Sequence, residues 1–181
     1  VFRFAMGVWW ALVAVLFVGS LYYPVEASFT KTGQFHGETT LDGLAYLERT
    51  NPDEYSAILW FEENAQRGEG VLESVGQDYN PAYGRISGST GLSTVLGWPG
   101  HEIQWRGTDK PLEGRAKDIR DIYTTSDPYK AHELLRKYDI TYVVIRPQEI
   151  ASYANIDVDK FSQIGELVFQ ERDVVIYRVR G

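Results

Sequence analysis

The stretch Ile140-Thr-Tyr-Val-Val-Ile145 decides the fold, because it is apolar on both faces. Strands of this kind are buried on both sides and lie at the centre of a sheet. Residues 166–170 and 174–179 flank a three-residue turn and predict an antiparallel hairpin at the sheet edge. Upstream, residues 71–75 and 93–97 predict two further strands.

Helical segments alternate with these strands. Asn51-Pro-Asp-Glu54 is typical of a helix start, with an N-cap, a proline in the first turn and two acids, and it predicts a helix to about Gln66. After Asp127-Pro128, apolar residues recur at i, i+3, i+4 and i+7, which predicts another helix. Further helices are expected at 83–92, 115–123 and 157–164. The alternation predicts a small Rossmann-like α/β domain with a mostly parallel sheet and a C-terminal antiparallel hairpin.

The N-terminal segment predicts a single transmembrane helix. Phe4 to Tyr23 contains no charged residue, and 20 helical residues at ~1.5 Å each span a ~30 Å hydrocarbon core. Pro24 is expected to end the helix. A buried core helix and a cleaved signal peptide are the alternatives. Arg3 before the run and Glu26 after it favour an extracytoplasmic location for the C-terminal part, at the cell membrane.

The expected organisation is a transmembrane helix at residues 1–24, a juxtamembrane connector at 25–50 and an extracytoplasmic α/β domain at 51–181. The net charge of −7 argues against a nucleic-acid partner. The chain has no cysteine, and its three histidines lack metal-ligand spacing, so no metal is expected. No phosphate-cradling or dinucleotide-binding glycine motif is present either, so no cofactor is expected.

A functional site is expected within the glycine-rich and tryptophan-rich stretch from Gly84 to Arg106. Ligands of open α/β sheets bind outside the carboxyl ends of the parallel strands, and the loops after the first two strands would meet at that edge. The ligand-binding candidates are Asp78, Arg85, Trp98, His101, Glu102, Trp105 and Arg106.

Each candidate also has a purely structural interpretation. His101 could hydrogen-bond its own loop, and the two tryptophans could be core plugs or loop anchors. Glu102 and Arg106 could form only a surface ion pair, worth ~0.3–0.5 kcal/mol. Arg85 could pair with Asp78 to join the two loops.

The run from Gly84 to Arg106 resembles the "YYY" membrane-protein family of Chloroflexi and archaea. Four other segments resemble it too: residues 41–47, 58–61, 71–75 and 137–144. The resemblance implies a polytopic protein whose transmembrane helices precede this tail, with a layout like that of the GT-C glycosyltransferases. Those enzymes use lipid-phosphate sugar donors and carry their catalytic acid in early loops between transmembrane helices. Such loops are absent from this sequence, so the catalytic residues stay unknown.

The leading hypothesis is an extracytoplasmic domain of a GT-C-like membrane protein that helps bind a lipid-phosphate-linked sugar donor or acceptor. In it Arg85 and Arg106 would contact phosphate, the tryptophans would stack on sugar or headgroup, and His101 and Glu102 would orient hydroxyls. Expected partners are the lipid bilayer, preceding transmembrane helices or other membrane subunits, and a lipid-linked sugar. The alternatives are a non-catalytic membrane-anchored accessory subunit and a sugar-binding module. The mass of the native chain separates the subunit from the polytopic enzyme.

Overall fold

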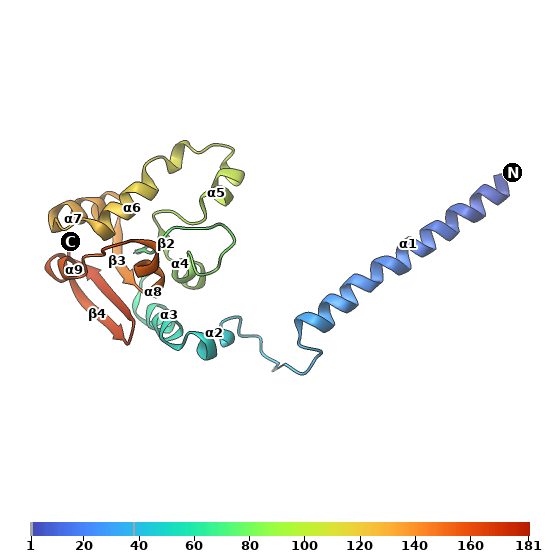
Figure 1. Ribbon diagram of the computed structural model, residues 1–181, viewed down its shortest axis with the longest axis horizontal. Helices are drawn as coiled ribbons and strands as arrows, with labels where there is room; N and C mark the ends of the chain where they lie inside the picture. Colours follow the sequence, from blue (N-terminus) through green and yellow to red (C-terminus); the bar gives the residue numbers. More distant parts are fainter. Residues whose placement is uncertain (1, 38) are drawn as a thin grey trace. The chain divides into compact units, whose positions relative to one another are not determined.

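The computed structural model describes residues 2–37 and 39–181, which divide into two compact units with a boundary between Gly43 and Leu44. The N-terminal unit is dominated by the helix α1, Phe2–Lys31, whose 30 residues include none that is buried (Figure 1). Among the described residues, α1 is the one helix long and apolar enough to cross a membrane. Its lack of buried residues contradicts the core-helix alternative, whereas a membrane span and a signal sequence both fit it.

The expectation that Pro24 ends this helix is wrong, because α1 continues for seven residues beyond it to Lys31. Proline lacks an N–H and so removes one hydrogen bond to the residue four positions earlier, while its φ remains helical. The residues that follow restore the backbone ladder. The helix ends where the Thr32 hydroxyl donates to the Ser28 carbonyl at 2.7 Å and Gly33 adopts a positive φ of 59°.

The second unit is built on a five-stranded mixed sheet in the order β2-β1-β3-β5-β4. The strands are β1 Gly70–Leu72, β2 Ser93–Thr94, β3 Ile140–Ile145, β4 Gly165–Glu171 and β5 Val174–Val179. Strands β2, β1 and β3 run parallel, and β5 and β4 form the antiparallel hairpin beside β3. The predicted α/β class, the central position of β3 and the C-terminal hairpin are confirmed.

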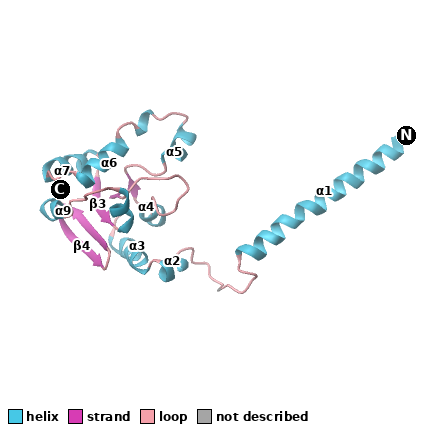
Figure 2. Ribbon diagram, in the orientation of Figure 1, coloured by secondary structure: helices cyan, strands magenta, loops and turns pink. Residues whose placement is uncertain are grey.

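Helices cover both faces of the sheet (Figures 1 and 2). They are α2 Ala45–Thr50, α3 Pro52–Asn64, α4 Arg85–Thr90, α5 Pro99–Arg106, α6 Arg115–Thr124, α7 Pro128–Lys137, α8 Pro147–Ser152 and α9 Asp159–Ile164, with a 3₁₀ turn, η1, at Lys110–Leu112. Alternate residues of β3 face two different cores. Tyr142 and Val144 pack with α3, whereas Val143 and Ile145 pack with α6, α7 and α9.

Helix α2 overlaps residues 40–47, where the sequence is compatible with a short helix, whereas α8 departs from the sequence prediction. The globular unit begins at Leu44, and Leu47 of α2 is buried against α3, within the segment expected to be a connector. The expected domain boundaries stay predictions. Residues 147–152, which form α8, are too few to show a helical apolar period, so the sequence did not reveal this helix.

Lys160 carries a buried charge beside the core that β3 forms with α6, α7 and α9. Its ammonium donates to the Tyr123 carbonyl at 2.6 Å and lies 4.6 Å from the centre of the Phe161 ring. Burial lowers the pKa of Lys160 to about 8, and attraction to Asp157 opposes this only in part. The folded state therefore gives up this proton at a lower pH than the unfolded chain, where the pKa of lysine is about 10.4.

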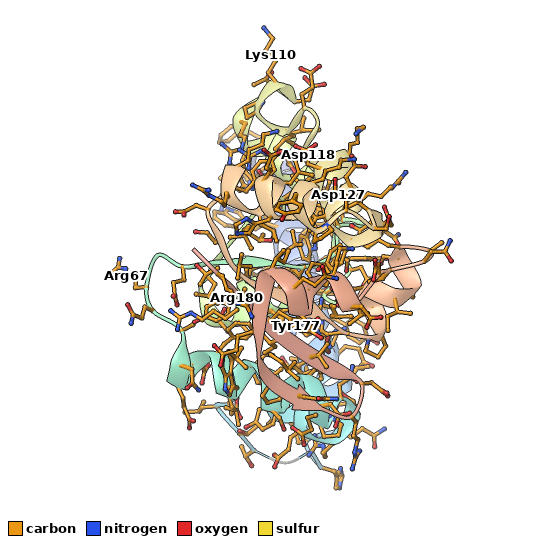
Figure 3. All side chains as sticks on the ribbon, turned by 90° about the vertical axis from the view of Figure 1, so that its left-hand side faces the viewer. Arg67, Lys110, Asp118, Asp127, Tyr177 and Arg180 are labelled. Atoms are coloured by element: carbon orange, nitrogen blue, oxygen red, sulfur yellow. The ribbon has the colours of Figure 1, made fainter. Side chains whose placement is uncertain are left out.

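We expect the free energy of unfolding to gain about 3 kcal/mol from Lys160 as pH rises from about 8 to about 10.4. The sign follows because the unfolded state binds the extra proton in this window. In Lys160→Met the rise should be smaller by that amount, as measured by urea unfolding of the full chain in detergent micelles at several pH values. Lys110→Met is the matched control, since Lys110 projects into solvent from η1 (Figure 3). Equal pH profiles for the Lys160→Met variant and the unsubstituted chain would contradict the prediction.

Candidate functional site

The loops that follow β1 and β2 meet at one edge of the sheet, as expected for adjacent parallel strands. Both oxygens of the Asp78 carboxylate accept from the Gly100 N–H, each at 3.1 Å. A Cβ on residue 100 would lie 2.2 Å from Asp78 Oδ2, so this approach requires glycine. Pro99 opens α5, and Asp78 occupies the positive N-terminal end of that helix.

Four aromatic side chains form a continuous row across this edge, which we call the aromatic ridge: Tyr79, Trp98, His101 and Trp105. The centre of the Tyr79 ring lies 5.5 Å from that of Trp98 and 5.6 Å from that of His101. The rings of His101 and Trp105 lie 6.0 Å apart on one face of α5. Tyr79 is 65% exposed and Trp105 is 78% exposed, so the two ends of the ridge are open to solvent.

Hydrogen bonds fix the orientation of the ridge. The Trp105 indole N–H donates to His101 Nε2 at 2.9 Å, so Nε2 carries a lone pair and Nδ1 carries the hydrogen in this arrangement. His101 Nδ1 lies 3.5 Å from the Tyr79 hydroxyl. The Trp98 indole N–H donates to the Tyr83 carbonyl at 3.0 Å, which anchors the half-buried Trp98 within the ridge. The ridge is therefore a preorganised surface rather than a set of independent side chains.

Glu102 and Arg106 form the predicted i, i+4 ion pair on the neighbouring face of α5, with Arg106 Nη2 and Glu102 Oε2 at 3.3 Å. The second oxygen of Glu102 accepts from the Gly97 N–H at 2.9 Å and so joins the segment after β2 to α5. The Arg106 side chain is 53% exposed. Glu102 thus has a structural task, and Arg106 presents an accessible positive charge beside the ridge.

Arg85 lies apart from the other candidates. It forms an ion pair with Glu54 of α3 and donates from Nε to the Pro81 carbonyl at 3.0 Å, so it pairs with Glu54 rather than with Asp78. Its side chain is only 13% exposed. It lines a pocket of about 190 Å³ together with Asp53, Glu54 and Asp173.

Arg85 belongs to a buried ion network that the sequence interpretation missed. The network centres on Arg146, which is 0% exposed and follows β3 directly. Arg146 donates to both oxygens of Glu149, at 2.9 and 2.7 Å, and to Glu54 Oε1 at 2.7 Å. Its Nη2 also lies 3.4 Å from Glu73 Oε2. A charged residue at the carboxyl end of a fully apolar strand, followed by Pro-x-Glu, was the signal that could have revealed it.

The carboxylates of this network also hold backbone groups. Glu73 accepts from the N–H groups of Ile86 and Ser87 at 3.1 and 2.9 Å, which fixes the start of α4. Glu149 accepts from both the N–H and the hydroxyl of Ser74. Asn51 is the N-cap residue of α3, but its side chain donates to Glu54 at 3.2 Å instead of capping the helix. The network therefore joins the carboxyl ends of β1 and β3 to α3, α4 and α8.

Charge pairing determines the protonation of the network. Burial by itself raises the pKa of Glu149, but attraction to Arg146 and hydrogen bonds from Arg146 and Ser74 outweigh it, and the net pKa is lowered. Burial by itself lowers the pKa of Arg146, yet Glu149, Glu73 and Glu54 together raise it above its ordinary value. The Arg146–Glu149 pair is therefore ionised at neutral pH, and the network has the character of a structural clamp. In the part of the chain that the structure describes, no group of three or more acidic or histidine side chains could hold a metal ion.

Comparison with known proteins finds similarity among solved structures. No family model matches the chain, and no curated protein sequence matches it. Among solved structures, the C-terminal globular domain of an oligosaccharyltransferase from Archaeoglobus fulgidus is similar, with 15% sequence identity and a TM-score of 0.47. The match covers 79% of this chain and 99% of that one.

Proposed function

We propose that this chain is a membrane-spanning helix and extracytoplasmic domain of a GT-C-like membrane protein of the "YYY" type. In this proposal the aromatic ridge, with Arg106 beside it, helps bind a lipid-phosphate-linked sugar donor or acceptor. The domain's task is binding; no catalytic group is assigned to it.

The observation that carries the proposal is the exposed, hydrogen-bonded aromatic ridge at the carboxyl edge of the parallel strands. Aromatic side chains bind the apolar face of a sugar ring. The rings of the ridge are held in place by the contact of Asp78 with the N-terminal end of α5 and by the hydrogen bond from Trp105 to His101. Arg106 is exposed and can offer its guanidinium to a phosphate oxygen. The helix α1 is long and apolar enough to cross a membrane, which favours a ligand that is itself anchored in the membrane.

The buried ion network narrows the set of residues that contact ligand in this proposal. Arg85 is held by Glu54 and by the Pro81 carbonyl. Recruiting it to a phosphate would break an ion pair that is nearly removed from solvent, which is costly. We therefore assign the phosphate contact to Arg106 and treat Arg85 as a structural member of the network.

We expect Trp105→Ala and Arg106→Ala each to weaken binding of a short-chain polyprenyl-phosphate sugar by about tenfold, which corresponds to about 1.4 kcal/mol. Binding is measured by calorimetry with the full chain in lipid nanodiscs. His101→Ala should have a smaller effect, because it removes the support of Trp105 rather than a contact area. The same polyprenyl phosphate without the sugar should keep the loss in Arg106→Ala and show none in Trp105→Ala.

Matched controls lie on the other helices. Tyr129 is 82% exposed at the start of α7, and Arg136 lies near the end of the same helix, so alanine at either position should leave binding unchanged. Binding of equal strength in the Trp105→Ala, Arg106→Ala and unsubstituted chains would remove the ridge from the ligand site.

A further inference from the structure

A second hollow lies beside the ridge, between α4 and the edge strand β2. Its volume is about 340 Å³, within the range of small-molecule sites, and three glycines line it: Gly84, Gly88 and Gly97. Trp98 forms another part of its wall. Glycines leave room for a ligand to approach the backbone. The hollow therefore gives a role to the glycines of the stretch from Gly84 to Arg106, which do not belong to the ridge.

One residue that lines the hollow, Thr94, has an unsatisfied polar group. Thr94 Oγ1 is buried and has no hydrogen-bond partner. It is the one buried side-chain oxygen or nitrogen without a partner in residues 2–37 and 39–181. Leaving a buried hydroxyl unpaired is unfavourable, so such atoms call for an explanation. Thr94 is also one of the residues that line the hollow, so a ligand there lies close to the unpaired hydroxyl.

The lining defines the chemistry of the ligand. Among the described residues no charged side chain lines this hollow, which argues against a phosphate or a carboxylate. Trp98 and Tyr83 supply aromatic surface, and the bond from the Trp98 indole to the Tyr83 carbonyl holds these two walls together. Ser87 and Thr94 supply hydroxyls. An uncharged molecule with an apolar face and several hydroxyls matches this set of groups.

We propose that this hollow binds one uncharged sugar ring, with a ring hydroxyl on Thr94 Oγ1 and its apolar face on Trp98. A peptide added as an extra strand fits less well, because the strand β2 pairs over only two residues, Ser93 and Thr94. The site shares Trp98 with the ridge but does not rest on a lipid-linked ligand there. A free sugar is sufficient to occupy it.

Two substitutions test the site without disturbing the fold. A Cβ on residue 88 would meet no atom within 4 Å, and its φ is not in the left-handed region, so Gly88→Leu places its side chain in the open space of the hollow. Thr94→Val keeps the shape of the side chain and removes only the hydroxyl. Gly43→Leu is the matched control, since a Cβ there also meets nothing within 4 Å and residue 43 does not line the hollow.

The experiment is saturation-transfer NMR and titration of the full chain, in a detergent without a sugar headgroup. The probes are the methyl glycosides of glucose, mannose, galactose and N-acetylglucosamine. At least one glycoside is expected to bind, with its affinity reduced by about tenfold or more in Gly88→Leu and in Thr94→Val, as for the loss of one good hydrogen bond or of the contact surface. Gly43→Leu should bind it as the unsubstituted chain does.

Three results would overturn the site. One is that none of the four glycosides binds, and another is that Gly88→Leu binds as well as the unsubstituted chain. The third is loss of binding only in Trp105→Ala, which would place the sugar on the ridge and so support the proposed function instead. Urea unfolding supplies an independent check. The midpoint of Thr94→Val should be unchanged or higher, because an unpaired hydroxyl has no hydrogen bond to lose, and a lower midpoint would show that Thr94 has a structural partner.

Discussion

Replacing Arg146 with methionine is expected to lower the free energy of unfolding by about 3–5 kcal/mol, because breaking a buried ion pair leaves carboxylates without a counter-ion. Arg146 is 0% exposed and bonds to Glu149 and Glu54, and its Nη2 lies 3.4 Å from Glu73 Oε2. Methionine fills a similar volume, so the loss comes from charge rather than from an empty cavity. A change of this size is a large share of the total stability of a domain, which is about 5–15 kcal/mol.

The measurement is urea unfolding of the full chain in detergent micelles, followed by near-ultraviolet circular dichroism. Arg172→Met is the matched control: the Arg172 side chain is 75% exposed, and its ion pair with Asp53 is 3.7 Å long. It should change stability by less than about 1 kcal/mol, as exposed ion pairs do. Similar losses in the two variants would show that Arg146 does not hold the network together.

Glu149→Gln is expected to lower stability by about 3 kcal/mol at pH 7, because it removes the carboxylate that Arg146 binds through both oxygens. The pKa of Glu149 is lowered in the folded state, so the unfolded chain takes up this proton first as pH falls. The stabilisation is present above the unfolded pKa of about 4.3 and is lost as pH falls through the folded pKa. The difference between the two chains should therefore narrow below about pH 4.

This profile is measured by urea unfolding between pH 3 and pH 7. Glu48→Gln serves as the control, since Glu48 lies on the exposed side of α2, and it should leave the profile unchanged. A stability difference between Glu149→Gln and the unsubstituted chain that is independent of pH would mean that the charge of Glu149 is not what stabilises the network.

Weakening the buried ion network should affect the two proposed binding surfaces differently. The network positions the start of α4 through Glu73, and α4 carries Gly88 of the hollow. The ridge is held by contacts of its own, from Asp78 to α5 and from Trp98 to Tyr83. A weakened network should therefore disturb the hollow before it disturbs the ridge.

Local patterns in the sequence determined the elements and their class. An apolar run of six residues specified β3, proline and acidic residues specified the start of α3, and a one-sided apolar stripe specified α7, since each depends on residues close in the chain. The same kind of reasoning placed Asp78 near α5, because adjacent parallel strands must end at the same edge. It failed at Pro24, where a local helix-breaking tendency was overcome by the helical residues on both sides.

Only the tertiary structure decided which charged side chains are buried together. Glu54, Glu73, Arg85, Arg146 and Glu149 are separated by up to 95 positions in the sequence, from residue 54 to residue 149, and only the pair Arg146 and Glu149 lies close together in the chain. Their pairing arises because β1, β3, α3 and α4 converge, and a buried charge is stable only beside its counter-ion. The unpaired hydroxyl of Thr94 was equally invisible in the sequence, because being unsatisfied is a property of the surrounding atoms and not of the residue.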